Sequence, residues 1–390
     1  MKEGWEYKKL KEVSSFQNGF AFKSNLFRKE GYPIVRISNI QNEEVQTDDI
    51  VYFNKEDYSV KFDNYKIYPN DILIAMSGGT TGKLGINTTN TIFYQNQRVG
   101  VIREDKKNLN HRFLFYFLHT KSEESLKIAA GAAQPNLSTA QIKDYIIPLP
   151  PLPEQQSIVA YLDSVFAKID AMKANAEKAL NEAKALFQAS LKEMLEPKEG
   201  IKWGTIGDLF ETYSGGTPTK SNKEYYEGGT IPWLRSGEVC QKDITQTEMF
   251  ITEKGLKASS AKYYPENTVV VAMYGATAAQ VGILRIEATS NQAVCGILPH
   301  KDFLPEFVYY WFSSIEDMLA AQAQGGAQPN ISQQKIKKVE IPIYSINKQQ
   351  SIVKTLDSLK SKVDKLQANY DIISQECDAL KQSILRQVFE

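Results

Sequence analysis

GAAQPNLS at residues 131–138 returns as GGAQPNIS at residues 325–332, at an offset of 194 residues. The same offset carries QQSIV from residues 155–159 to residues 349–353. Gapless agreement over so many positions is the signature of an internal repeat. We therefore expect the chain to fold as two copies of one unit, in the order head, helix, head, helix.

The segment that ends each copy is predicted to form one long helix. Apolar or small residues recur at alternating steps of four and three over residues 158–190 and 352–384, which is the pattern of a coiled-coil seam. This register puts Met172, Leu186 and Leu380 in the seams. Because the first helix leads to the second head and the second helix leads back, we expect the seams to pack antiparallel, about a pseudo-twofold axis.

The heads are predicted to mix helices and strands. Residues 71–76 and 268–273 are short apolar runs that lead into glycine and threonine, which is typical of buried strands that enter loops. Aromatic runs at residues 113–118 and 307–312 predict short core helices. The expected fold class is α+β, with two mixed α/β domains joined by two long antiparallel coiled-coil helices. We place the boundaries of head, helix, head and helix at residues 1–152, 153–197, 198–345 and 346–390.

Charge and composition limit the possible functions. The 390 residues hold 46 basic and 46 acidic side chains, so affinity for nucleic acid must come from local basic surfaces or from partners. No apolar run is long enough to span a bilayer, and the first residues lack the pattern of a signal peptide. We therefore expect a cytoplasmic protein with no membrane partner. The three cysteines are far apart and the three histidines are isolated, so we expect no disulfide framework and no metal site.

The length of the predicted helices has a functional meaning. Residues 158–190 would rise roughly 48 Å at about 1.5 Å per residue. Because B-DNA advances about 3.4 Å per base pair, heads held at that distance would sit about 14 base pairs apart. Two related heads about a twofold axis suit a duplex, whose backbone has the same symmetry. Since the head sequences differ, we expect two different half-sites, with the paired helices as a ruler between them.

Taken in order, these motifs resemble one protein family. Gly216-Thr217-Pro218 lies early in the second head and IPWLR follows at residues 231–235; an Asn-Gln pair, a Gln-Pro-Asn segment, an Ile-Pro stretch and QQSIV come after it. This ordered set resembles the specificity subunit of type I restriction-modification systems, and the resemblance covers the whole chain. The first head departs from the family's pattern, because QNGFAFKS at residues 17–24 stands in place of the Gly-Gly-Thr-Pro motif.

The resemblance implies that each head is a target recognition domain for one half of a bipartite, asymmetric site on double-stranded DNA. It also implies that the helices dock two methyltransferase subunits, which bind S-adenosylmethionine, and that restriction subunits complete the nuclease. In this chain itself we expect no cofactor and no catalytic residue. It has no Asn-Pro-Pro-Tyr motif for a flipped adenine and no glycine-rich motif for a methyl donor.

The loops that follow predicted strands hold the candidate DNA contacts. Glycine allows close backbone approach, and threonine and lysine can meet phosphates and base edges. Arginine can fork onto guanine, asparagine can bind adenine, and glutamate can accept from cytosine. The alternative for each candidate is ordinary turn chemistry or a surface ion pair. The candidates are Lys23, Ser24, Arg36, Ser38, Asn39, Ser77, Thr80, Thr81, Lys83 and Arg98 in the first head, and Thr217, Lys220, Arg235, Ser236, Glu238, Tyr274, Thr277 and Gln280 in the second.

Residues that both heads share are predicted to be structural, because heads that bind different sequences should not share base contacts. We therefore assign Gln134-Pro135-Asn136 and Gln328-Pro329-Asn330 to the geometry between head and helix. Asn96-Gln97 and Asn291-Gln292 have the chemistry to bind adenine, but we favour a structural role for them.

A second apolar line on the first helix makes its hydrophobic face wider than a two-stranded seam. This line contains Phe166, Leu180, Phe187 and Met194, which either dock a partner subunit or pack against the heads. Two other functions remain open. One is a coiled-coil adaptor between proteins, which the zero net charge favours, and the other is the recognition part of a split DNA methyltransferase of another type.

Overall fold

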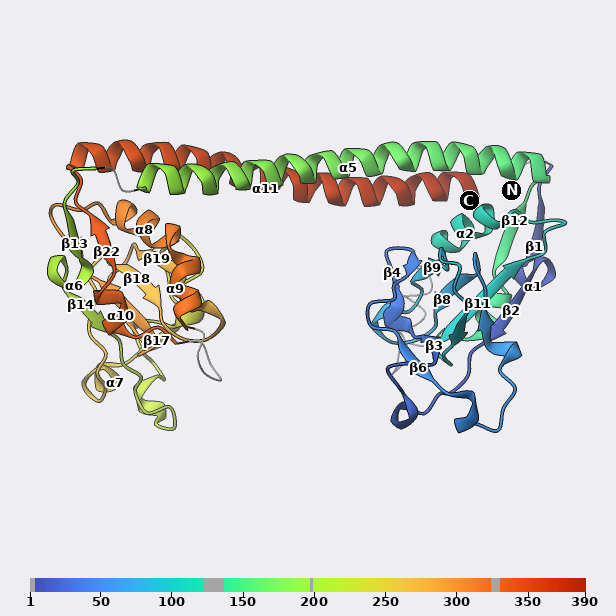
Figure 1. Ribbon diagram of the computed structural model, residues 1–390, viewed down its shortest axis with the longest axis horizontal. Helices are drawn as coiled ribbons and strands as arrows, with labels where there is room; N and C mark the ends of the chain where they lie inside the picture. Colours follow the sequence, from blue (N-terminus) through green and yellow to red (C-terminus); the bar gives the residue numbers. More distant parts are fainter. Residues whose placement is uncertain (1–3, 122–136, 197–198, 324–329) are drawn as a thin grey trace. The chain divides into compact units, whose positions relative to one another are not determined.

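The computed structural model describes residues 4–121, 137–196, 199–323 and 330–390. It consists of two compact units, Met1–Ala176 with Asp371–Glu390, and Glu177–Tyr370. Gln134-Pro135-Asn136 and Gln328-Pro329 lie outside the described residues, so the role assigned to that motif stays a prediction. Each unit contains one head and the ends of two long helices (Figure 1).

The head of the first unit is built on two sheets (Figure 1). The larger sheet has the strand order β2 (Ser14–Asn18), β11 (Val99–Glu104), β8 (Ile72–Ala75), β9 (Leu84–Ile86), β5 (Glu44–Val45) and β4 (Ile40–Gln41). The smaller sheet has the order β6 (Val51–Phe53), β3 (Tyr32–Val35), β10 (Phe93–Gln95) and β7 (Lys66–Ile67). Strands β2, β11, β8 and β9 pair antiparallel, whereas β3 and β10 are parallel. The fully buried β8 confirms the strand predicted at residues 71–76.

Short helices close this head. They are α1 (Leu10–Val13), α2 (His111–Thr120) and α4 (Thr139–Lys143), and the pair β1 (Glu6–Lys9) and β12 (Ile146–Leu149) lies beside them. The side chain of Asn110 caps α2 by accepting from the Phe113 N–H, because a helix start leaves its first N–H groups without partners. Six consecutive residues of α2 are buried, which confirms the predicted core helix at residues 113–118.

The head of the second unit repeats this architecture. Its larger sheet has the order β14 (Thr212–Ser214), β21 (Val294–Ile297), β18 (Val269–Ala272), β19 (Val281–Leu284) and β16 (Asp243–Ile244). Its smaller sheet has the order β17 (Met249–Ile251), β15 (Ile231–Leu234) and β20 (Thr289–Ser290), and β13 (Trp203–Thr205) pairs with β22 (Glu340–Pro342). The helices are α6 (Ile206–Leu209), α7 (Glu253–Lys257), α8 (Pro305–Ser314), α9 (Glu316–Ala323) and α10 (Gln333–Lys337). Strand β18 and helix α8 confirm the elements predicted at residues 268–273 and 307–312.

The two long helices are α5 (Leu152–Leu195) and α11 (Ile346–Phe389), of 44 residues each. In the first unit, Lys173 Nζ bonds Asp378 Oδ1 at 3.2 Å and Lys381 Nζ bonds Asp170 Oδ1 at 2.6 Å. In the second unit, Lys184 Nζ bonds Gln367 Oε1 at 2.7 Å. Residue numbers rise along one helix as they fall along the other, so the helices pair antiparallel within each unit, as predicted.

The register of the predicted seam is wrong at several positions. Met172 and Leu186 are 61% and 60% exposed, and Leu380 is 50% exposed. A straight helix drifts by about 20° per heptad relative to a strict seven-residue repeat, and the heads widen the face that must be covered. Along α5, the side chains that face inward therefore change from the predicted seam, which contains Met172 and Leu186, to the neighbouring apolar line, which contains Leu180.

The second apolar line packs inside its own unit. Leu180 is 3% exposed, Phe166 lies against the core of the first unit, and Phe187 and Met194 lie against the core of the second. Phe166 also makes an edge contact with Tyr116, with ring centroids 5.4 Å apart. Of the two alternatives named for these four residues, the structure has packing within the units, while Phe166, Phe187 and Met194 remain half-buried and their docking of a partner stays a prediction.

A buried glutamine joins each head to its long helix. Gln155 Oε1 accepts from the Asn110 N–H at 2.8 Å, and Gln155 Nε2 donates to Asn108 O at 2.9 Å and Pro150 O at 2.8 Å. Gln349 makes the same three bonds at the repeated positions of the second unit, at 2.8 to 2.9 Å. Both side chains are fully buried. The repeated QQSIV motif therefore positions the head on the helix through its first glutamine.

A tyrosine and an aspartate reinforce each joint. The Tyr116 hydroxyl donates to Asp163 in the first unit, and the Tyr310 hydroxyl donates to Asp357 at 2.5 Å in the second. Burial, together with the bond to the carboxylate, raises the pKa of both tyrosines. The two hydroxyls therefore stay protonated and act as donors.

Replacing Gln155 or Gln349 with methionine is expected to lower the free energy of unfolding by roughly 2–4 kcal/mol, because one N–H and two carbonyl groups lose their partner in a buried site. The matched controls are Gln156→Met and Gln350→Met. These side chains are the neighbours in the same motif and are exposed, so they should change stability by less than about 0.5 kcal/mol. Denaturant unfolding of the four variants measures the difference. Equal effects at buried and exposed positions would refute the role of the joint.

Candidate nucleic-acid interface

Four loops meet at one end of the larger sheet in the first unit. The Met76 N–H, just after β8, donates to Arg98 O at 2.9 Å, and the Leu137 N–H donates to Met76 O at 2.8 Å. The Gln97 N–H donates to Phe20 O at 2.8 Å. These bonds fix the loop after β2, the loop after β8, the turn before β11 and the start of the segment that leads to α4 as one surface.

The second unit brings the same four loops together. The Met273 N–H donates to Ala293 O at 2.7 Å, and the Ile331 N–H donates to Met273 O at 2.8 Å. The Gly216 N–H donates to Ser290 O at 2.9 Å. The backbone is thus the same in both heads, and the side chains that it presents differ. This combination suits recognition of two different ligand sequences by one framework.

Five candidates of the first head have exposed side chains and are available to a ligand. They are Lys23, Ser24, Ser38, Lys83 and Arg98. Lys83 and Arg98 lie on the convergent loops, whereas Lys23 and Ser24 lie further along the loop after β2.

Asn39 and Thr81 have structural roles instead of the expected DNA contacts. Asn39 is 2% exposed, and its Oδ1 accepts from the Arg36 N–H at 2.9 Å. Thr81 is 1% exposed, and its hydroxyl donates to Gly78 O at 2.7 Å. Both side chains stabilise the short 3-10 turns η2 (Ile37–Asn39) and η5 (Gly78–Thr80) that carry their neighbours. Turn chemistry, the alternative named for them, is therefore what the structure has.

Glu238 also has a structural role in the second head. Its Oε1 accepts from the Arg235 N–H at 3.0 Å, and its Oε2 accepts from the Glu248 N–H at 2.8 Å. The guanidinium of Arg235 is in turn paired with Glu238 and Glu248. Glu238 therefore caps its turn, and both of its carboxylate oxygens already accept hydrogen bonds from the protein.

Several buried polar atoms on these loops have no hydrogen-bond partner among the described residues. They are Arg36 Nε, Ser77 Oγ and Thr80 Oγ1 in the first unit and Gln280 Oε1 in the second. A buried polar atom without a partner costs about 1–3 kcal/mol. A ligand that supplies partners after a small side-chain rotation would recover that cost. These four atoms lie on residues that the sequence had named as contacts.

The remaining candidates of the second head differ in how far their side chains are exposed. Lys220 is exposed, and the Thr217 hydroxyl donates to Gln292 Oε1. Ser236, Tyr274 and Thr277 are half-buried. Tyr274 and Thr277 belong to the loop of η8 (Gly275–Thr277), which is the counterpart of η5.

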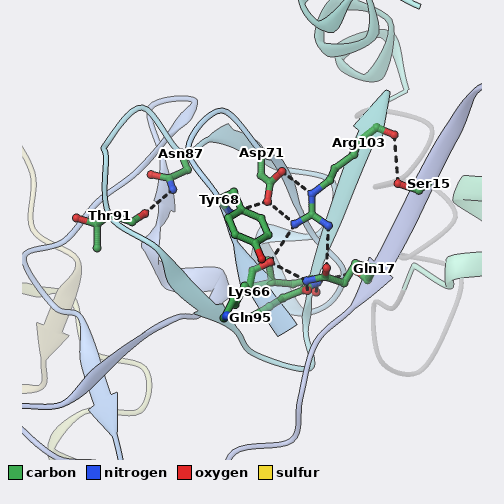
Figure 2. A network of polar contacts seen from close by, with 10 residues as sticks. Ser15, Gln17, Lys66, Tyr68, Asp71, Asn87, Thr91, Gln95 and Arg103 are labelled. Atoms are coloured by element: carbon green, nitrogen blue, oxygen red, sulfur yellow. Dashed lines mark hydrogen bonds and ion pairs between the residues drawn. The ribbon is translucent and has the colours of Figure 1, made fainter. Parts of the chain in front are cut away.

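An arginine network that the sequence did not indicate joins the two sheets of the first head (Figure 2). Arg103 Nε donates to Asp71 Oδ1 at 2.6 Å, and its Nη1 donates to Gln17 Oε1 at 2.8 Å. Gln17 Nε2 also donates to Gln95 Oε1 at 2.6 Å, and Gln95 Nε2 donates to Val99 O. Gln17, Gln95 and Arg103 lie on β2, β10 and β11, and Asp71 directly precedes β8. The network therefore ties both sheets together, with Arg103 and Asp71 at the ends of β11 and β8 that lie away from the loops.

Comparison with known proteins identifies the family. The model of the type I restriction modification DNA specificity domain matches residues 2–182 and again residues 198–372. The specificity subunit of Escherichia coli EcoR124I/EcoR124II is 31% identical over 266 residues, which cover 65% of this chain and 64% of the relative. The Escherichia coli EcoBI specificity subunit is 25% identical over 422 residues, which cover 99% of this chain and 86% of the relative.

Solved structures share the fold. A chain of a type I R-M system, from a study of its complex assembly and conformational transition, superposes with a TM-score of 0.77 at 18% identity and covers 99% of this chain and 98% of its own length. The HsdS subunit from Thermoanaerobacter tengcongensis gives a TM-score of 0.55 at 17% identity, covering 100% and 97%.

Two further observations concern the described residues alone. Within them, no helix has both the length and the apolar character needed to cross a membrane. In the same part of the chain, no three His, Cys, Asp or Glu side chains are grouped to hold a metal ion. The family assignment rests on neither. Because the family model covers both repeats, the chain belongs to the specificity subunits of type I restriction-modification systems, the non-catalytic subunits that recognise DNA.

Proposed function

We propose that this chain recognises a bipartite, asymmetric sequence on double-stranded DNA, with residues 1–152 and 198–345 as the two target recognition domains. The observation that carries the proposal is the duplicated set of four convergent loops with unequal side chains. Lys83 has Gln280 as its counterpart after the 3-10 turn, and Arg98 has Ala293 as its counterpart in the turn before the next strand. One framework with different polar groups suits two different half-sites.

The proposed contacts follow from exposure and from unpaired atoms. Lys23, Lys83, Arg98 and Lys220 are placed against phosphates or guanine edges, because they are exposed cations. Arg36, Ser77, Thr80 and Gln280 carry the buried atoms without partners, so a base edge would complete their hydrogen bonding. Ser24, Ser38, Thr217, Arg235, Ser236, Tyr274 and Thr277 remain proposed contacts of lower weight.

The chain is proposed to act in a complex with two methyltransferase subunits, which bind S-adenosylmethionine, and with restriction subunits. Its zero net charge supports a need for partners, since phosphate binding is dominated by positive charge. Tyr161 and Met172 are large apolar side chains of α5 that face solvent in the first unit. Their spacing puts them on one face of the helix, and we propose this face as the docking surface.

The sequence of methylated sites in cells that carry this chain with its methyltransferase tests the proposal. One motif made of two short, different parts separated by a fixed spacer is expected. Methylation without any common motif would reject DNA recognition by this chain. A motif with only one continuous part would reject the bipartite reading and leave the family assignment unchanged.

Removing two interface cations provides a quantitative test. In the assembled complex, Lys83→Ala and Arg98→Ala are each expected to make the salt dependence shallower. The negative slope of the log binding constant against log salt concentration should lose about 1 in magnitude, because a phosphate that is no longer contacted keeps its counterion in the complex. Lys107→Ala is the matched control. Lys107 is exposed too, but it follows the opposite end of β11. Titrations of a cognate duplex at several salt concentrations give the slopes. A slope equal to that of the unmodified complex would remove either residue from the interface.

A further inference from the structure

The second head contains a recess whose lining includes Thr217, Lys220 and Arg235, three of the proposed DNA contacts. Its volume is about 480 Å³, within the range of about 300–1,000 Å³ that is typical of small-ligand sites. Tyr226, Trp233 and Met249 supply its apolar lining. Its charged lining consists of Lys220, Lys223, Arg235 and Glu227, and Arg235 is already paired with Glu238 and Glu248. We call this the Trp233 recess.

The aromatic wall of the recess is held in place. Trp233 Nε1 donates to Gly216 O at 3.0 Å, and the Tyr226 hydroxyl donates to Pro218 O at 2.6 Å. The two rings meet edge to face, with centroids 5.9 Å apart. Because both polar tips are satisfied by the Gly216–Pro218 loop, the wall offers an apolar surface. A flat ring can pack against such a surface without displacing a hydrogen bond.

The rim supplies cations and amides. Lys220 makes no ion pair within the described residues. Lys223 Nζ lies 3.6 Å from Glu227 Oε1, and both side chains are largely exposed. Water therefore screens this ion pair strongly. Gln292 Oε1 accepts from Thr217, and Asn291 Oδ1 accepts from the Ala293 N–H. Within the described residues, the amide NH₂ groups of Asn291 and Gln292 have no acceptor and are left to donate. Ammonium groups beside free amide donors suit a phosphate next to a heterocycle with acceptor atoms.

The two heads differ at the loop that holds the aromatic wall. In the first head Phe20 stands at the position of Gly216 and packs edge to face against Phe22 and Phe62, with centroids 5.0 and 5.3 Å away. In the second head no side chain fits at Gly216, because an added Cβ would lie 2.3 Å from the Ala261 backbone nitrogen. The glycine instead lets the backbone pass close to Ala261 and accept the bond from Trp233.

We propose that the Trp233 recess binds a single nucleotide. Its base packs against Tyr226 with its edge on Asn291 and Gln292, and its phosphate lies against Lys220 and Lys223. The nucleotide is either one unit of the bound half-site, in which case this inference rests on the proposed function, or a free nucleotide. For the DNA case, the second head would bind one base outside the stack, a state that proteins reach by base flipping.

Two variants test the recess. Lys220→Ala with Lys223→Ala removes the phosphate contacts, and Gln292→Trp puts an indole at the mouth of the recess. All three side chains are exposed, so the fold should be retained. The matched control is Lys257→Ala, an exposed lysine of α7 that does not line the recess. The assembled complex is titrated with its cognate duplex, and the full chain is titrated with each of the four deoxynucleoside monophosphates, with tryptophan fluorescence as the readout.

For a DNA nucleotide, both variants are expected to weaken duplex binding about tenfold or more, while the control stays within about twofold. For a free nucleotide, the monophosphate titration saturates in the unmodified chain and is abolished by Gln292→Trp. The Gln292→Trp variant then leaves duplex binding unchanged. If Gln292→Trp alters neither titration, the recess has no nucleotide and the inference is overturned, even if the lysine pair weakens DNA binding from the surface. Failure of the proposed function is a separate result, because it appears as a lack of sequence preference in the unmodified complex.

Discussion

Replacement of Arg103 with methionine is expected to lower the free energy of unfolding of the first unit by about 3 kcal/mol. Arg103 pairs with the nearly buried carboxylate of Asp71 and also donates to Gln17 and to Lys66 O. Removing the arginine leaves a carboxylate without its cation, which typically costs about 3–5 kcal/mol in a fully buried pair. The guanidinium is partly exposed, so the lower end of that range applies.

Arg28→Met is the matched control. Arg28 also makes a two-pronged contact with an aspartate, Asp57, but its side chain is half exposed. An exposed pair contributes about 0–1 kcal/mol. Denaturant unfolding gives the two energies, and hydrogen exchange of β8 and β11 amides locates the loss. If the two variants lose the same stability, the network of Figure 2 has no special role in the first head.

Arg103→Met should also affect DNA binding. The network connects the two sheets through Gln17 and Gln95, and Gln95 directly precedes the turn before β11 that we propose as part of the interface. A looser connection between the two sheets would let these loops move apart, so the preference for the first half-site should fall more than the preference for the second. This difference between half-sites separates a positioning role from a general loss of folded protein.

The elements that depend on short-range pattern could be predicted from the sequence. The run at residues 71–76 is a buried strand and the run at residues 113–118 is a core helix, because periodicity and β-branching are local properties. The internal repeat gave the order of heads and helices. It could not tell that Gln155 is buried whereas Gln156 is exposed, since both glutamines are repeated equally well.

The register of the long helices could not be predicted from the helix sequences alone, because it depends on how the heads pack against them. Two adjacent apolar lines were visible in the first helix, one with Met172 and one with Phe166. The heads decide between them, because Tyr116 packs against Phe166 while Met172 faces solvent. A heptad pattern alone treats the two lines as equivalent candidates for the seam.

The candidate site was only partly predictable for a related reason. The structure confirms that the loops of residues 77–83 and 274–280 follow buried strands, whereas their contacts with DNA stay a prediction. Asn39 and Glu238 have the chemistry of base contacts, but each caps its own turn, and capping depends on backbone angles that composition does not reveal. The partners of Arg103 lie 32 and 86 residues away, so no local pattern could connect them. The Trp233 recess is lined by Lys220, Met249 and Gln292, among others, which lie far apart in the sequence, so no local pattern could reveal it.

Lengthening both long helices by one heptad is expected to lengthen the spacer of the recognised site by about three base pairs, because seven residues add about 10 Å of helix. Residues 170–176 of α5 and residues 375–381 of α11 form a matched pair of heptads, since Asp170 bonds Lys381 and Lys173 bonds Asp378. Duplicating both segments therefore inserts a length that carries its own ion pairs and keeps the pairing of Lys184 with Gln367 beyond it.

Duplicating only one of the two segments is the control, because it puts the helices out of register and should abolish a defined spacer. The methylated motif of cells carrying each variant gives the result. With both duplications, the two halves of the motif should be unchanged, since no loop residue is altered, and only their separation should grow. Methylation at the original spacing would show that the helices do not set the distance. A change within either half-site would show that the helices and the loops are coupled, contrary to a model in which the head loops determine the bases and the helix length determines the spacing.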